Sequence, residues 1–255
     1  MYELIVFPVV GVVASLVGSM SGLGGGFLAI PILYYIGVVP EYVVSSAKFM
    51  VFVNSAMSTY RYLREIKFSP HLYGSVVLPM IVTAYIGAYL VAILPRSILL
   101  LLIGIILLIG SLRMLVSKQR EAGGKASGAT GREKILVGFL SGSLSGFIAG
   151  ISGLGGGVVN MPIFLYILGL DPHIAVSMSM AAILPSALSS VVRHVIDGIV
   201  RWEIAVPLGI GACIGGFIGP RLALRVEKER LRKLIGIVML IATTRIIVDA
   251  VLTLF

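Results

Sequence analysis

The same glycine-rich motif, Ser-Gly-Leu-Gly-Gly-Gly, occurs twice in this chain of 255 residues, first at 21–26 and again at 152–157. Each glycine motif lies within apolar sequence and leads into a short apolar run with a proline, Pro31 or Pro162. Glycine costs about 1 kcal/mol relative to alanine inside a helix, so each motif predicts an interruption between two helices. In a membrane, such open backbone is tolerated only where protein or a water-filled cavity covers it. The sequence therefore predicts one covered, non-helical element in each half of the chain.

The composition is that of a membrane protein. Hydrophobic residues make up 58% of the chain and charged residues only 12%, and the mean hydropathy is +1.07. A soluble domain carries about 25% charged residues, so this chain lacks the polar surface to cover a globule in water. We expect an all-α, multi-pass protein of the cell membrane, surrounded by lipid. The net charge of +9 does not indicate a nucleic-acid partner, because the basic residues lie in short loops between apolar runs, where they orient membrane proteins.

Residues that could carry out chemistry are sparse. Cys213 is the only cysteine, and His71, His173 and His194 show no ligand-like spacing. We find no paired base, carboxylate dyad or nucleotide-binding loop. The sequence therefore predicts no catalytic residues, no metal site and no cofactor, and it disfavours an enzyme.

The two halves align with each other beyond the glycine motifs. Gly11 aligns with Gly142, and Arg61 with Arg193. We interpret residues 1–116 as membrane repeat 1, 117–134 as a flexible, basic, cytoplasmic linker, and 135–255 as membrane repeat 2.

Each repeat is expected to contain a glycine-broken helical hairpin followed by three transmembrane helices. The apolar runs after the glycines hold about twelve residues, which span about 18 Å as a helix and cannot cross a hydrocarbon core of about 30 Å. Either each run returns to the side from which the hairpin entered, or an ordinary crossing is followed by a short tilted one. Both readings invert the second repeat relative to the first. The inverted reading also gathers most Lys and Arg on one side, with both termini outside.

Inverted-repeat transporters bind substrate near the midplane, where broken helices point their N-termini at anions. The helices that begin at Gly26 and Gly157 would bring free backbone N–H groups and the positive ends of two helix dipoles to such a place. The alternative is that the glycines only allow close helix packing. The candidate substrate-binding glycines are Gly22, Gly24, Gly25, Gly26, Gly153, Gly155, Gly156 and Gly157.

Three side chains join this candidate site. Lys48 is the basic residue placed well inside an apolar segment, where a charge is a functional candidate, although it could also extend to the outer interface. Asn54 lies on the same helix, on one face with Ser58, and could line a path or simply bond to neighbouring helices. Asn160 follows the second glycine motif and could favour a polar substrate oxygen. Pro185 lies inside a predicted helix and should leave the carbonyl of Ala181 without its helical donor.

The two glycine motifs, the phrase Gly169-Leu170-Asp171-Pro172-His173-Ile174-Ala175-Val176-Ser177 and the phrase Val38-Val39-Pro40-Glu41-Tyr42 resemble the TauE/SafE sulfite exporter family. The resemblance covers nearly the whole chain. It implies a multi-pass carrier of small sulfur-containing or organic anions such as sulfite or sulfonates, usually moved outward, with the motif glycines at the site. At Ser45-Ser46-Ala47-Lys48 the chain departs from the Gly-Thr-Ser and apolar residue of many members, and members differ widely in substrate.

We therefore expect a secondary transporter, in the export direction, that binds a small anion at the midplane between the two glycine motifs. An anion channel with a fixed pore lined by the same motifs is the alternative. A proton or a sodium ion is a candidate coupling ion, and a homodimer is left open.

Overall fold

The computed structural model describes residues 3–64, 66–116, 131–223, 244 and 246–248. Most of the expected linker, at 117–130, and most of the last apolar segment lie outside the described residues. The described part is all-helical and contains no strand, which confirms the predicted helical class. Its elements are α1 (Glu3–Ser21), α2 (Gly26–Tyr35), α3 (Pro40–Tyr62), α4 (Pro70–Ile93), α5 (Arg96–Val116), α6 (Gly131–Ser152), α7 (Gly157–Pro162), the π-helical turn η1 (Ile163–Ile167), α8 (Pro172–Ile196) and α9 (Trp202–Leu222).

Four of the described helices, namely α4, α6, α8 and α9, are long and apolar enough to cross a membrane. Shorter apolar helical stretches cover Ile5–Ser21, Gly26–Tyr35, Arg96–Ile109 and Gly157–Ile167. This set of helices fits the predicted multi-pass membrane protein. Helix α3 has 23 residues but is less apolar than these four, because it carries most of the polar candidates.

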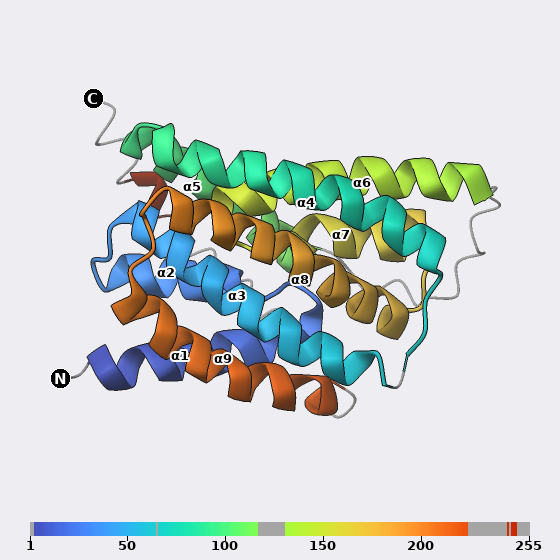
Figure 1. Cartoon of the computed structure of the whole chain (residues 1–255), viewed down its shortest axis with the longest axis horizontal. Helices are drawn as coiled ribbons and strands as arrows, with labels where there is room; N and C mark the ends of the chain where they lie inside the picture. Colours follow the sequence, from blue (N-terminus) through green and yellow to red (C-terminus); the bar gives the residue numbers. More distant parts are fainter. Residues whose placement is uncertain (1–2, 65, 117–130, 224–243, 245, 249–255) are drawn as a thin grey trace.

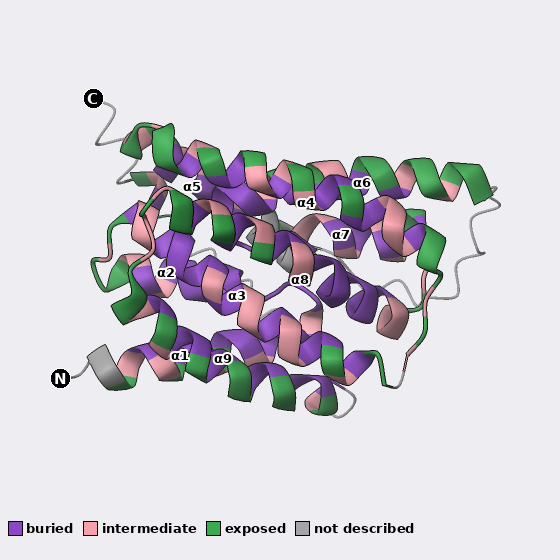
Figure 2. Cartoon of the chain, viewed as in Figure 1, coloured by how far each residue is buried: buried purple, intermediate pink, exposed green. Residues whose placement is uncertain are grey.

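Helices α3 and α8 pack against each other, and both carry long runs of buried residues (Figure 2). On one flank α1 packs along α9, which also contacts α3, and on the other α6 packs along α4, which also contacts α8. Outward-facing apolar side chains remain exposed along the flanking helices, as lipid contact requires.

Small residues bring the flanking helices close together. A Cβ atom on Gly11 of α1 would lie 3.0 Å from the carbonyl carbon of Leu208 in α9. A Cβ atom on Gly142 of α6 would likewise lie 3.0 Å from the Cα atom of Val76 in α4. Close backbone approach of this kind holds helices together in lipid, where no hydrophobic effect drives their association.

Two short helices return toward the end of the molecule from which their preceding helices start. Helix α1 starts at the left of Figure 1 and α2 ends there, whereas α6 starts and α7 ends toward the right. We call α1–α2 the first hairpin and α6–α7 the second hairpin. Their open ends thus lie at opposite ends of the molecule, and their turns are the two glycine motifs.

Pro185 lies inside α8, as expected. The carbonyl of Ala181, one turn earlier, accepts a hydrogen bond of 3.0 Å from the hydroxyl of Tyr73 in α4. The polar group that the proline leaves without a helical donor therefore links α8 to α4.

Candidate functional site

Each glycine motif separates two helices by a turn that only glycine adopts easily. In the first motif φ is 91° at Gly24 and 90° at Gly25, and in the second it is 94° at Gly155 and 85° at Gly156. These values lie in the left-handed region, where a Cβ atom is strained. The predicted interruption of both helices is confirmed, and the two turns have nearly the same shape.

The two glycine motifs touch each other inside the molecule. A Cβ atom on Gly24 would lie 3.5 Å from the Cα atom of Gly155, and one on Gly155 would lie 3.4 Å from the Cα atom of Gly24. A Cβ atom on Gly26 would lie 3.0 Å from the Cα atom of Leu154. Segments far apart in the sequence thus meet backbone to backbone, and the absence of side chains makes this contact possible.

The helices that leave the motifs begin with unused backbone donors. Within the described residues, the backbone N–H groups of Gly26 and Phe27 have no backbone acceptor, nor do those of Gly157 and Val158. The first N–H groups of a helix normally need capping side chains, water or a ligand. Neither N-cap residue, Gly25 or Gly156, can cap with a side chain.

Not all of the candidate glycines face the opposite motif. A Cβ atom on Gly25 would lie 2.6 Å from the carbonyl oxygen of Ala14, and one on Gly156 would lie 2.6 Å from the hydroxyl of Ser145. These two glycines therefore allow each hairpin to close on itself. The hydroxyl of Ser145 also donates a hydrogen bond of 2.8 Å to the carbonyl of Gly156, which holds the second turn against α6.

The glycines at the start of each motif, Gly22 and Gly153, instead contact the two helices that pack against each other, α3 and α8. A Cβ atom on Gly22 would lie 3.2 Å from the Cα atom of Val176 in α8, and one on Gly153 would lie 3.3 Å from the Cα atom of Val44 in α3. Val51 of α3 lies beside both Gly24 and Gly155: its Cγ1 atom would lie 3.2 Å from a Cβ atom on Gly24 and 3.1 Å from one on Gly155. The paired motifs are therefore covered by α3 and α8.

Asn54 bonds directly to the first glycine motif. Its amide nitrogen donates a hydrogen bond of 2.9 Å to the carbonyl of Gly24, and its oxygen accepts one of 3.3 Å from Ser58. Ser58 also lies 3.1 Å from the carbonyl of Gly216 in α9. Asn54 is fully buried, so it positions the turn of the first hairpin.

Lys48 does not extend to an interface. Its side chain is 0% exposed, and Nζ donates a hydrogen bond of 2.8 Å to the carbonyl of Ala149, in the last turn of α6 before the second motif. Among the described residues, the structure shows an ion pair between Arg193 and Asp197 and none that involves Lys48. The sequence left its placement open, and burial decides against the interfacial alternative.

Asn160 is fully buried in α7, three residues after the last glycine of the second motif. Its oxygen accepts a hydrogen bond of 3.2 Å from Ser141, and its amide nitrogen lies 3.7 Å from the sulfur of Met80. It thus fastens the short helix to α6 and α4.

Sequence reasoning missed His194. It is fully buried near the end of α8, and both of its ring nitrogens lack a hydrogen-bond partner among the described residues. Ser186 and Ser190 precede it at intervals of one helical turn, and both are buried. This polar spacing along one inward face was the signal that could have found it.

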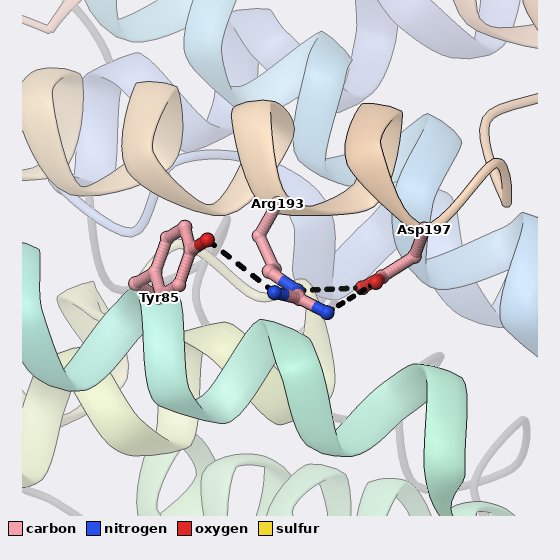
Figure 3. Close-up of polar contacts among 3 residues, drawn as sticks. All are labelled: Tyr85, Arg193 and Asp197. Atoms are coloured by element: carbon pink, nitrogen blue, oxygen red, sulfur yellow. Dashed lines mark hydrogen bonds and ion pairs between the residues drawn. The ribbon is translucent and has the colours of Figure 1, made fainter.

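The end of α8 is fastened to α4 by a polar cluster (Figure 3). Arg193 forms an ion pair with Asp197 and donates a hydrogen bond of 3.3 Å to the hydroxyl of Tyr85. Its guanidinium also lies 4.3 Å from the ring centroid of Tyr89, at a distance typical of a cation–π contact. This cluster is a structural link between helices and lies apart from the glycine motifs in sequence and side-chain contact.

Among the described residues, no group of three or more His, Cys, Asp and Glu side chains could hold a metal ion. This region contains free backbone N–H groups, the buried ammonium of Lys48 and the buried side-chain amides of Asn54 and Asn160. Such groups suit recognition of an anion.

Comparison with known proteins extends over almost the full chain. The probable membrane transporter protein YunE of Bacillus subtilis is 25% identical over 97% of this chain and 98% of its own length. A probable membrane transporter protein of Methanocaldococcus jannaschii is 32% identical over 61% of this chain and 59% of its own length. Sulfite exporter TauE/SafE family protein 2 of Arabidopsis thaliana is 40% identical over 22% of this chain and 12% of its own length.

No solved structure matches this chain significantly. The family model described as sulfite exporter TauE/SafE matches residues 7–246, which include both glycine motifs and all of the inner helices. The resemblance drawn from the motifs is thereby confirmed: the chain belongs to the sulfite exporter TauE/SafE family, a family of membrane transporters and not of enzymes.

Proposed function

We propose that this protein is a secondary transporter, acting as an exporter, for small sulfur-containing or organic anions such as sulfite or sulfonates. The anion binds where the two glycine motifs meet. The observation that carries the proposal is the direct contact between the two glycine motifs, each of which leads into a helix whose first backbone N–H groups have no described backbone acceptor. Helix N-termini carry partial positive charge, so a pair of them favours a negative ligand without a metal or a cofactor.

The paired arrangement supports two inverted repeats, each a glycine-broken hairpin with three further transmembrane helices. Ser58 bonds to the carbonyl of Gly216, and its repeat counterpart Ser190 lies 3.3 Å from the carbonyl of Ala84. These contacts join equivalent positions of the two halves, between α3 and α9 and between α8 and α4. We therefore retain 1–116 and 135–255 as the repeats, with 117–134 as the cytoplasmic linker, although α6 already begins at Gly131.

The close contact of the motifs favours a carrier over a channel. An anion can lie between Gly24 and Gly155 only if one hairpin moves away from the other, because a single Cβ atom added at either glycine would already touch the opposite backbone. A fixed pore would need a permanent gap at this place. Movement of one repeat against the other instead supplies the gap and closes it again, as alternating access requires.

The site residues take different parts in this proposal. The backbone of Gly26 and Gly157 supplies donors, Gly24 and Gly155 leave the space, and Lys48 supplies positive charge beside the second motif. The remaining assigned residues shape the two turns and hold them in place: Gly22, Gly25, Gly153, Gly156, Asn54 and Asn160.

Substrate class is tested with the purified protein by thermal shift and by flux into proteoliposomes, using sulfite, thiosulfate, methanesulfonate and acetate. We expect saturable uptake and a raised melting temperature with at least one sulfur oxyanion. Currents far larger than carrier turnover would support the channel, and no flux with any anion would contradict the transport proposal.

The site is tested with Gly155→Ala against Gly37→Ala. Both glycines have left-handed φ, 94° and 93°, so both substitutions impose the same backbone strain. At Gly37 the added methyl group meets nothing within 4 Å, whereas at Gly155 it fills the space facing Gly24. We expect Gly155→Ala to abolish flux and Gly37→Ala to retain it, with both proteins inserted in the membrane. Equal flux in the two variants would place the site elsewhere.

A further inference from the structure

Two buried bases lie on the helices α3 and α8, which pack against each other. Lys48 of α3 and His194 of α8 are both 0% exposed. One turn before Lys48, the hydroxyl of Ser45 donates a hydrogen bond of 2.7 Å to the carbonyl of Ile199, and the N–H of Ile199 donates one of 3.1 Å to the carbonyl of His194. The start of α3 is thus tied to the end of α8 by hydrogen bonds that involve the carbonyl of His194 and the hydroxyl of Ser45, three residues before Lys48.

Lys48 and His194 have fewer hydrogen-bond partners among the described residues than their polar atoms can use. The Lys48 ammonium has three donors, and the structure gives it one acceptor, the carbonyl of Ala149. The two ring nitrogens of His194 have none among the described residues. A buried charge without a counter-ion is costly, so an empty site favours loss of the lysine proton.

The charges around the pair leave it without a described acidic partner. Arg193, next to His194 on α8, is already paired with Asp197 and covers the rings of Tyr85 and Tyr89 on α4. The end of α6 that faces Lys48, residues 145–152, contains no titratable side chain. On α3 the nearest carboxylate is Glu41, two turns before Lys48, and on α9 it is the exposed Glu203.

The transported anion can act as the counter-ion of Lys48. Val44 and Val51, one turn before and one turn after Lys48 on the same face of α3, contact the second glycine motif at Gly153 and Gly155. An anion held at the motifs would therefore lie next to Lys48 and offset its charge. Positive charges on both Lys48 and His194 would repel each other inside one buried helix interface, so the pair holds one proton rather than two.

We propose that Lys48 and His194 form the coupling-proton site of this transporter, which takes up one proton when the anion binds and releases it when the anion leaves. The proposal rests on the proposed transport function and names its coupling ion. The proton comes from water on one side and returns to water on the other, so no co-reactant is required. Anion and proton then move in the same direction, so the outward gradient of the anion drives export, and an imposed inward proton gradient reverses it.

The experiment uses proteoliposomes that contain a pH-sensitive dye. Radiolabelled thiosulfate and methanesulfonate serve as substrates, because their charge stays constant around neutral pH. In the wild-type protein we expect an imposed anion gradient to move protons into the vesicles together with the anion, and an inward proton gradient to drive anion accumulation. We expect Lys48→Met to weaken anion transport, because it removes positive charge beside the second motif, and to move no proton with each anion that still crosses. Methionine suits this position, because Met180 is the repeat counterpart of Lys48 and is fully buried.

His194→Gln and His71→Gln complete the set. His194→Gln removes the second base of the pair and should also lower the number of protons moved per anion, whereas His71 is exposed at the start of α4 and its substitution should change nothing. If Lys48→Met does not insert or transports nothing, the wild-type and His194→Gln measurements decide. Anion flux without proton movement in the wild type, or unchanged proton movement in His194→Gln or Lys48→Met, overturns the proposal. Absence of all anion flux in the wild type would instead contradict the transport function itself.

Discussion

At the residue scale, polar side chains serve mainly to hold backbone that has left the helical pattern. Asn54 is the clearest case, since its amide is the described side-chain donor to the carbonyl of Gly24. A carbonyl in a turn of this kind has no helical donor, and leaving it unpaired in a buried place costs about 1–3 kcal/mol. Where a membrane helix is interrupted, hydrogen bonds from side chains replace the regular backbone hydrogen bonds of the helix.

We therefore expect Asn54→Ala to lower the free energy of unfolding by about 1–3 kcal/mol. Ser55→Ala is the matched control, because Ser55 is equally buried on the same helix but its hydroxyl bonds only to Phe52, one turn earlier. Unfolding of both proteins in detergent, followed by temperature or denaturant, gives the comparison. Equal stability of the two variants would show that the bond to Gly24 contributes little.

At the element scale, the short helices are positioned by glycines in ordinary helical conformation as well as by those in the turns. Gly157 is the first residue of α7 and does not have positive φ, so alanine there carries no backbone strain. A Cβ atom at this place would nevertheless lie 2.5 Å from the Cα atom of Leu23 in the opposite motif. We expect Gly157→Ala to destabilise the protein by about 1–3 kcal/mol through overpacking.

The control is Gly74→Ala in α4, where the new methyl group meets nothing within 4 Å. Alanine should there be neutral or stabilising by up to about 1 kcal/mol, because it is the better helix former. Melting temperatures in detergent distinguish the two variants. A Gly157→Ala protein as stable as Gly74→Ala would mean that the hairpins can separate freely at the motifs.

The sequence predicted the elements better than their contacts. Helix propensity alone located both interruptions, since four of the five residues 22–26 are glycine, and apolar length identified the crossing helices. The neighbours of Lys48 could not be predicted, because burial depends on how α3 packs against α6, which are distant in sequence. His194 was overlooked for a related reason: it was assessed for spacing to other histidines, whereas the contact of Ser45 with Ile199, which ties the end of its helix to α3, joins residues far apart in the sequence.

At the scale of the whole molecule, the two ends of the helix bundle carry different charge. The α3–α4 connection and the start of α6 lie at the right of Figure 1 and carry Arg64, Lys67, Arg132 and Lys134. The α2–α3 and α8–α9 connections lie at the left, where Arg201 is the basic residue of these two segments. Positively charged loops stay in the cytoplasm, so the right end should be cytoplasmic and the left end external.

Cysteine labelling tests this orientation with positions that the structure describes. The exposed Cys213 is first replaced by serine, and single cysteines are then introduced as Gly37→Cys and Gly198→Cys at the left end and Ser69→Cys and Gly131→Cys at the right end. None of the four glycine or serine positions lies in the middle of a helix, so the strain that cysteine brings at the positive φ of Gly37 and Gly198 falls in connections and not in the packed core. A membrane-impermeant maleimide added to intact cells should label the first two and spare the other two, which become reactive only after the membrane is opened. The reverse pattern would invert the predicted orientation, and labelling of both ends from one side would contradict the assignment of these connections to opposite faces, on which the inverted repeats depend.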